Sequence, residues 1–305
     1  MTTPATQDAH AHFFSRTFFT TLASLSPRGT EPEALVREVI AAAKLELPDA
    51  DAGVHRDRWL EQMERHGVAR MACFASVPQE AEIVAAAARG SGGRLLPYAM
   101  VNLADPGAAA FAERALGSLG FRGLLTFPAM HHVHVGDPLV SPLLEAARRH
   151  RAPVIVHCGI LRVKLRDLFG IPRPYDLSYA HPLGLVPAAQ RFPDVTFVVP
   201  HFGGGFLHEL LMAGRQCENI WLDTSSSNDW LATLPGRLTL ADVFRSALDV
   251  FGAERMLFGT DSSTFPRGWR ADIRDTQLAA LATAGASDAQ VAAIMGGNFA
   301  RLLPG

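Results

Sequence analysis

Short apolar or β-branched runs alternate along most of the chain with longer segments that have helical periodicity. We predict strands at 7–12, 68–75, 94–101, 122–127, 153–158, 195–200, 219–224 and 255–259. Between them stand amphipathic segments such as DRWLEQMERHG and TLADVFRSALDVFG, whose apolar residues recur at the three- and four-residue spacing of a helix. This alternation indicates a parallel sheet built from βαβ units.

Several of the predicted strands are apolar almost without interruption, as in PVIV and VTFVV. Such runs are expected where a strand is covered on both faces. An open doubly wound sheet would look similar, but GGGF at 203–206 has neither a dinucleotide-binding nor a P-loop spacing. We therefore predict a single-domain (β/α)₈ TIM-like barrel spanning residues 1–305.

The segment 13–57 is too long for a simple loop and contains its own helical stretch, EPEALVREVIAAAKLEL. We interpret it as an insertion after the first strand. Because loops at the carboxyl ends of barrel strands build the active site, we expect this insertion to roof it.

Composition and net charge limit the classes of molecule that the protein is expected to bind. The chain is 48% hydrophobic and 19% charged, with a formal net charge of -2, so it offers no general electrostatic reason to bind nucleic acid or an acidic membrane. We expect a small-molecule substrate, and an outer helical surface through which copies of the chain can associate. Cys73, Cys158 and Cys217 lie far apart in apolar contexts, which predicts reduced core residues.

The opening MTTPATQDAH lacks the basic start and apolar stretch of a signal peptide. No stretch reaches the roughly 18 apolar residues that would span a bilayer. We expect a cytoplasmic protein without a membrane partner.

Polar residues repeatedly follow predicted strands that are otherwise apolar. In DAHAHFF, strand alternation places His10 and His12 on one face. His157 ends PVIVH, His201 follows VTFVVP and Asp261 follows RMLFGT. Each histidine alone is more typical of a surface or strand-capping residue, but strand ends converge at one face of a barrel. Three imidazoles and a carboxylate suit one divalent first-row metal, zinc first and manganese second.

The motifs DAHAH, IVHCG, VVPHFGGG and LFGTDSS resemble the strand-end motifs of the amidohydrolase superfamily over nearly the whole chain. More narrowly, they are similar to the amidohydrolase-related (amidohydrolase 2) branch of aminocarboxymuconate-semialdehyde decarboxylase and its related decarboxylases, hydratases and lactonases. The resemblance implies the following metal ligands: His10, His12, His157 and Asp261.

The same resemblance implies that His201 lies beside a metal-bound water and transfers protons. Binuclear members carry a bridging lysine or glutamate on the fourth strand, where RGLLTFP offers Thr126, so we expect one metal. A bound divalent cation lowers the pKa of water from about 15.7 toward 7 and polarises carbonyl groups. We therefore predict His201 and Asp261 as the catalytic residues.

Two reactions follow, with hydrolysis slightly favoured. The first is hydrolysis of a small amide, ester or lactone that carries a carboxylate. The alternative is non-oxidative decarboxylation of an aromatic or unsaturated carboxylic acid. A third interpretation, a non-catalytic metal-binding barrel, requires a closed site, which His201 argues against.

Basic and aromatic residues near the predicted site are candidates for binding substrate. Arg162 and Arg166 lie in a basic loop after the fifth strand, which can bind a carboxylate or simply face solvent. Arg267 and Trp269 follow Asp261 closely, and His134 belongs to the MHHVHV run after the fourth strand. We predict that these residues contact substrate: Arg162, Arg166, Arg267, Trp269 and His134.

Two further carboxylates have open roles. Asp8 shares the strand parity of His10 and His12, so it either orients a ligand or is solvated. Asp223, in DTSSSNDW after the seventh strand, is expected to form part of a hydrogen-bonding wall near the pocket.

Overall fold

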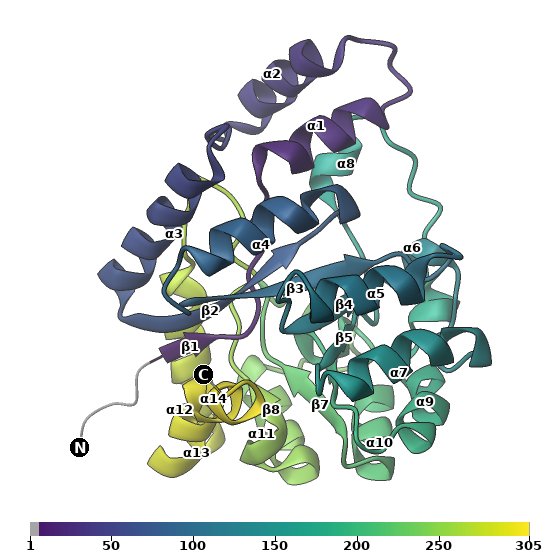
Figure 1. The fold of residues 1–305 in the computed structure, drawn as a ribbon. Helices are drawn as coiled ribbons and strands as arrows, with labels where there is room; N and C mark the ends of the chain where they lie inside the picture. The colour runs from purple at the N-terminus through teal and green to yellow at the C-terminus, as the bar shows by residue number, and fades with distance from the viewer. Residues whose placement is uncertain (1–5, 305) are drawn as a thin grey trace.

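A computed structural model describes residues 6–304 (Figure 1). Its sheet has eight strands in sequence order, and every neighbouring pair is parallel. The strands are β1 (Thr6–Asp8), β2 (Val68–Ala75), β3 (Leu95–Val101), β4 (Gly123–Thr126), β5 (Val154–Val156), β6 (Phe197–Val199), β7 (Ile220–Asp223) and β8 (Met256–Leu257). This order confirms the predicted (β/α)₈ architecture.

The sheet closes on itself through the segments that follow β1 and β8. The Ala9 amide donates to the carbonyl of Phe258 at 2.9 Å, and the Asp261 amide donates to the carbonyl of His10 at 2.9 Å. The regular part of the first strand ends at Asp8, four residues earlier than predicted. Beyond Asp8 the backbone forms isolated β-bridges with two different neighbours. Ala11 pairs with Ser262 in the segment after β8, and His12 pairs with Phe74 of β2.

The helices alternate with the strands and surround them (Figure 1). They are α1 (Arg16–Ser24), α2 (Pro32–Ala43), α3 (Ala52–His66), α4 (Ala81–Arg89), α5 (Ala108–Gly117), α6 (Pro128–His131), α7 (Ser141–Arg149), α8 (Lys164–Leu168), α9 (Val186–Arg191), α10 (Leu207–Gln216), α11 (Leu240–Phe251), α12 (Ala271–Ala284), α13 (Asp288–Ala292) and α14 (Asn298–Leu302). The short 3₁₀ helices are η1 (Pro78–Glu80), η2 (Pro138–Val140), η3 (Leu177–Ala180), η4 (Pro182–Leu185), η5 (His201–Gly203), η6 (Asp229–Thr233) and η7 (Ala253–Arg255), and η8 (Ala293–Gly297) is a π-helix.

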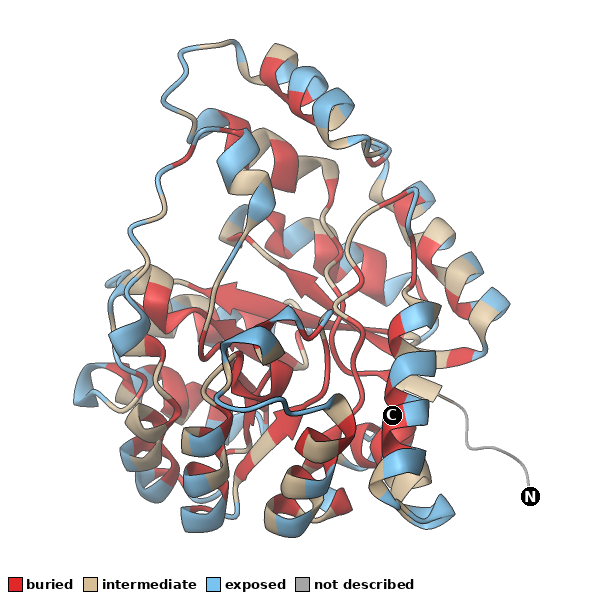
Figure 2. Ribbon diagram, turned by 180° about the vertical axis from the view of Figure 1, so that it is seen from behind, coloured by how far each residue is buried: buried red, intermediate tan, exposed pale blue. Residues whose placement is uncertain are grey.

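Strand alternation divides the buried side chains into two layers, and the strands are buried almost throughout (Figure 2). Cys73, Val154 and Leu222 point outward and pack in the cluster beneath the helices. A second cluster contains the alternate strand residues, such as Phe74 and Ile155, and includes residues of the C-terminal segment. The sequence pattern of continuous apolar runs is explained by this burial on both faces.

A separate hydrophobic cluster lies above the barrel, at the end of the molecule occupied by α1 and α2 (Figure 1). We call α1, α2 and α8 the cap. Phe18 and Leu22 of α1 pack with Leu35 of α2, and Phe169 and Ile171 after α8 join them. The cap is therefore built by two loops, the one after β1 and the one after β5. The helix α3, which begins within the predicted insertion, instead packs on β2 and α4 as part of the outer ring.

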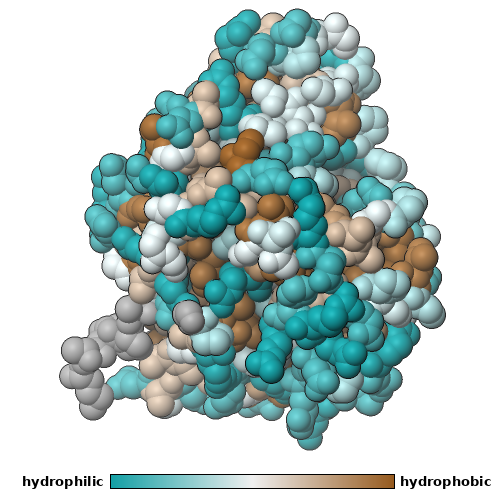
Figure 3. Space-filling model, in the orientation of Figure 1, coloured by the Kyte–Doolittle hydropathy of each residue, from teal (hydrophilic) through white to brown (hydrophobic). Residues whose placement is uncertain are grey.

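The structure tests some of the remaining predictions, on cysteines and membrane helices, and leaves others untested. Cys73, Cys158 and Cys217 are free and buried, as predicted. No helix within residues 6–304 is long and apolar enough to cross a membrane. The start of MTTPATQDAH, where a signal peptide would begin, lies outside the described residues. On the face shown in Figure 3, hydrophobic residues form small groups among hydrophilic ones, and no single large apolar patch of the described residues marks an interface there. Association between copies of the chain stays a prediction.

Candidate metal centre

The structure brings together three of the four predicted ligands at the carboxyl ends of the strands. The Nε2 atoms of His10 and His12 lie 3.7 and 3.3 Å from Asp261 Oδ1. Their ligand atoms all fall within 4.8 Å of one another. Two imidazole nitrogens and a carboxylate oxygen converging in this way fit a divalent first-row cation.

Asp223 holds His10 in the orientation that a metal ligand needs. Its Oδ2 lies 2.8 Å from Nδ1 of His10, and its side chain is 0% exposed. A carboxylate only accepts hydrogen bonds, so Nδ1 donates and the lone pair of His10 stands on Nε2, facing Asp261. Asp223 and His10 also group with His201 at metal-ligand spacing. Because the Asp223–His10 distance is a hydrogen bond, we assign Asp223 to ligand orientation rather than to the metal.

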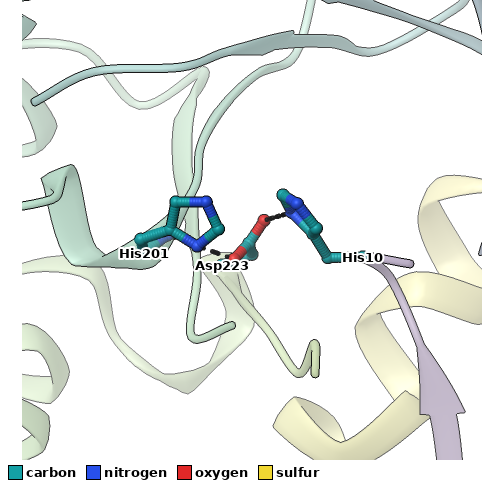
Figure 4. Close-up of side chains that lie close together, drawn as sticks. All are labelled: His10, His201 and Asp223. Atoms are coloured by element: carbon teal, nitrogen blue, oxygen red, sulfur yellow. Dashed lines mark hydrogen bonds and ion pairs between the residues drawn. The ribbon is translucent and has the colours of Figure 1, made fainter. Parts of the chain in front are cut away.

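Asp223 lies between His10 and His201 (Figure 4), and it orients His201 through the Ser225 hydroxyl. The Ser225 hydroxyl donates to Asp223 Oδ1, so its oxygen accepts from Nδ1 of His201 at 2.8 Å. The Nε2 of His201 is therefore unprotonated. Asp223 Oδ1 also accepts from the backbone amide of His201 at 3.2 Å. One buried carboxylate thus sets the tautomers of two imidazoles.

His12 is held by a serine from the neighbouring strand. Its Nδ1 lies 2.6 Å from the hydroxyl oxygen of Ser76, just after β2. The contact leaves Nε2 facing Asp261. Both histidines of the HxH motif therefore use Nδ1 for the protein and present Nε2 to the candidate centre.

His157, the fourth predicted ligand, lies beside this group but outside its ligand-atom spacing. Its ring centroid is 5.3 Å from that of His201. Its buried Nδ1 has no hydrogen-bond partner among the described residues. The metal-binding role of His157 stays a prediction, and the unpaired nitrogen is consistent with it.

Backbone strain marks the same strand ends. His201, Phe202 and Asp261 have φ values of 58°, 52° and 58°, in the left-handed region that non-glycine residues rarely adopt. Such strain gathers at functional sites, where surrounding contacts hold it. The turn after β6 packs closely on the segment after β5: a Cβ on Gly204 of GGGF would lie 2.9 Å from the carbonyl oxygen of Cys158, and one on Gly159 would lie 2.2 Å from that of Gly203.

Burial and the neighbouring charges shift the pKa values of the site in opposite directions. Burial raises the pKa of Asp261, but His12, His201 and His10 outweigh it and hold that pKa well below its usual range. Burial lowers the pKa of His10, but Asp223 and the other nearby carboxylates raise it above the ordinary value.

The other imidazoles favour the neutral form. Burial, reinforced by the neighbouring imidazoles, lowers the pKa of His157 to about 3. Burial and His10 also lower the pKa of His201. A neutral imidazole is the form that binds a metal or accepts a proton.

Asp8 is a buried anchor rather than a solvated carboxylate. Its side chain is 0% exposed and accepts hydrogen bonds from the His10 amide at 3.0 Å and the Thr260 hydroxyl at 2.5 Å. The indole of Trp269 donates to it at 2.8 Å. Trp269, a predicted substrate contact, is only 3% exposed and uses its polar atom in this way.

The other predicted substrate contacts are scattered around the site. Arg267 is exposed and donates to the Ser263 hydroxyl at 3.2 Å. His134 is exposed with its ring 4.6 Å from that of Tyr179, and Arg162 is exposed in the β5 loop. Their roles stay predictions.

Arg166 has a buried polar atom that nothing in residues 6–304 satisfies, its Nε. Tyr175, which the sequence reasoning missed, has a hydroxyl in the same state. Tyr175 lines a cavity of about 470 Å³ together with Ile160, Leu161, Arg173 and Leu177. The only sequence signal for Tyr175 is its place between Arg173 and Asp176 in the basic loop, a pattern equally typical of a solvated turn.

Residues 7–305 match the sequence profile of the family described as amidohydrolase. The chain belongs to the amidohydrolase family. No curated protein matches it. The predicted resemblance is therefore confirmed at the level of an enzyme family.

Solved structures of similar fold include both decarboxylases and a hydrolase. One is 5-carboxyvanillate decarboxylase from Sphingomonas paucimobilis, 17% identical over 97% of this chain and 98% of that chain, with a TM-score of 0.65. Another, assigned as a 2-pyrone-4,6-dicarboxylic acid hydrolase from Pseudomonas putida, is 18% identical over 99% and 98%, with a TM-score of 0.59.

A third is 5-carboxyvanillate decarboxylase from Novosphingobium aromaticivorans, in complex with manganese and 4-hydroxy-3-methoxy-5-nitrobenzoic acid. It is 14% identical over 99% of each chain, with a TM-score of 0.64. At these identities the likeness extends to the fold alone. The reaction of this amidohydrolase must be argued from its own residues.

Proposed function

We propose that this amidohydrolase hydrolyses a small carboxylated ester, lactone or amide. The observation that carries the proposal is the tautomer of His201. Because the Nδ1–H of His201 donates to the Ser225 hydroxyl, whose own proton goes to Asp223, His201 offers an unprotonated Nε2 beside the ligand group. A neutral imidazole is suited to take a proton from water as water attacks a carbonyl.

The residues that would hold one divalent cation are His10, His12 and Asp261, with His157 as a fourth ligand. Zinc is the first choice for three imidazoles and a carboxylate, and manganese the second. When bound, the cation would acidify water and polarise the substrate carbonyl. Asp223 and Ser76 keep the Nε2 atoms of His10 and His12 turned toward the centre.

A carboxylate on the substrate is supported by the loop after β5. Arg166 Nε and the Tyr175 hydroxyl are buried donors without partners in the described chain. Burying such donors unpaired costs about 1–3 kcal/mol each, which a bound anion would offset. The cavity lined by Tyr175 and Arg173 is large enough for a small ligand.

The test uses carboxylated lactones and esters in water labelled with heavy oxygen. We expect label in the product acid, loss of turnover on chelation, and recovery with Zn²⁺ or Mn²⁺. Unchanged turnover after verified metal removal would contradict the proposal, and so would product formation without label.

Decarboxylation of an aromatic or unsaturated acid is the second candidate, favoured by the same unpaired Arg166 and Tyr175 donors, which suit an acid as substrate. Release of carbon dioxide, with no oxygen from labelled water in the organic product, distinguishes it from hydrolysis.

A further inference from the structure

Glu80 is a fully buried carboxylate between the cap and the candidate metal centre. It ends η1, directly after β2, and its side chain is 0% exposed. Its Oε1 accepts from the amide and the hydroxyl of Ser15 at 2.6 and 2.7 Å, and its Oε2 accepts from the amide of Ser76 at 2.9 Å. Three donors converge on this one side chain, so the position requires a group that only accepts hydrogen bonds.

The two serines lead in opposite directions. Ser76 places its hydroxyl 2.6 Å from Nδ1 of His12 and so orients a predicted metal ligand. Ser15 precedes the first residue of α1, but its hydroxyl bonds Glu80 instead of capping that helix. Glu80 therefore ties the start of the cap to the residue that positions His12.

Two apolar contacts reinforce this connection. The ring of His12 stacks on Phe14 with centroids 4.8 Å apart, and Phe14 stacks on Phe18 of α1 at 4.0 Å. Val77, next to Ser76, packs in the hydrophobic cluster of the cap. A shift of α1 relative to the barrel would therefore disturb both sides of the His12 imidazole.

We propose that Glu80 is a positioning residue that joins His12 and the cap into one hydrogen-bonded unit, so that metal binding and cap closure depend on each other. This inference rests on the metal centre of the proposed function, but not on the reaction. By thermodynamic linkage, a metal that favours the oriented His12 must also favour the closed cap. Burial raises the pKa of Glu80 to about 7, while the hydrogen bonds that Ser15 and Ser76 donate to it favour the ionised form.

Hydrogen exchange with Mn²⁺ as the probe tests this dependence without any substrate. In the wild-type protein, saturating Mn²⁺ should slow amide exchange in residues 16–24. In Glu80→Gln the amide NH₂ must face a donor, so this protection should be lost. Mn²⁺ affinity should fall about tenfold, the lower end of the effect of removing an outer-shell partner.

Glu82→Gln is the matched control, because Glu82 is exposed on α4 and pairs with Arg114. It should behave as the wild type in both measurements. Ser76→Ala cuts the link to His12 but keeps the bonds of Glu80 to Ser15. Ser76→Ala should weaken Mn²⁺ binding and remove the Mn²⁺-dependent protection of residues 16–24. If Glu80→Gln does not fold, the Ser76→Ala result tests the inference on its own.

Undiminished Mn²⁺-dependent protection in the folded Glu80→Gln or Ser76→Ala variant would overturn the inference. Mn²⁺ binding to the wild type without any protection of residues 16–24 would also overturn it, while leaving the proposed hydrolysis intact. If the wild type bound neither Mn²⁺ nor Zn²⁺, the metal centre and this inference would fail together.

Discussion

The buried carboxylates beside β7 and β8, Asp223 and Asp8, have hydrogen-bond partners, whereas β5 and its loop contribute buried polar atoms without partners in the described chain. Farther along the loop after β7, the Asn228 Oδ1 and Trp230 Nε1 atoms are unpaired as well within residues 6–304. On the first side, the Asp223 carboxylate bonds His10, Ser225 and the His201 backbone, and Asp8 bonds Thr260 and Trp269. On the second, three buried polar atoms lack partners in the described chain: Nδ1 of His157, Nε of Arg166 and the hydroxyl of Tyr175.

This difference in hydrogen bonding indicates that the two sides of the site have different functions. A fully satisfied network holds its members in one geometry, which suits groups that must be oriented before the reaction. Unsatisfied buried donors are costly, so they are retained where a ligand completes them. We interpret the β7–β8 side as the preorganised scaffold of the ligands and base, and the β5 side as the part that meets the metal and substrate.

The largest effect is expected from removing the base on the scaffold side. His201→Gln should lower kcat by about 10²–10⁴-fold, because a positioned general base contributes that much. Steady-state kinetics on a substrate identified by the labelling assay measures it. His208→Gln, at an exposed position of α10, is the control. A comparable loss of kcat in that variant would show that the effect comes from a disturbed fold and not from loss of the general base.

Asp223→Asn tests the scaffold itself. An amide can donate as well as accept, so the tautomers of His10 and His201 are no longer fixed. We expect metal affinity or kcat to fall about 10–100-fold, as for other outer-shell partners of metal ligands. Calorimetric Zn²⁺ titration measures the affinity, with exposed Asp229→Asn as the control. A wild-type affinity together with a wild-type kcat would refute the orienting role.

The β5 side should affect substrate binding more than the chemical step. Tyr175→Phe and Arg166→Gln remove donors assigned to the substrate carboxylate, so KM should rise about tenfold, the lower end for a hydrogen bond to a charged group. Arg162→Gln, at an exposed position in the same loop, should leave KM unchanged. If kcat fell while KM stayed constant, the donors would belong to the scaffold side.

The last prediction concerns stability and pH in the metal-free protein, apart from the kinetics. The pKa of His157 is lowered from 6.5 to about 3 by burial and by the neighbouring imidazoles. The unfolded chain then binds the extra proton, so this group's contribution to stability is lost as pH falls from about 6.5 toward about 3, by on the order of 1 kcal/mol per pH unit.

Denaturant unfolding of the wild type and His157→Gln over that range tests the point. The difference in unfolding free energy between the two proteins should shrink as the pH falls. A difference independent of pH would show that His157 is protonated equally in both states.

Much of the fold was predictable because β-strands buried on both faces require long apolar runs. The strand at Val68–Ala75 was located to the residue. The first strand was not, since its bonds alternate between two partners distant in sequence. The insertion after it was recognised, but α8 belongs to the same cap through contacts that local periodicity does not report.

The amino-acid sequence was enough to locate the candidate ligands: the spacing of His10 and His12 placed both on one side of a strand, and Asp261 followed the last strand. Their hydrogen-bond partners could not be found from the sequence. Asp223 reaches His10 across 213 positions of sequence, and Glu80 connects Ser15 to Ser76, because barrel closure and the β1–β2 pairing bring these segments together. Local spacing fixes the direction of a side chain, but hydrogen-bond partners depend on the closed barrel.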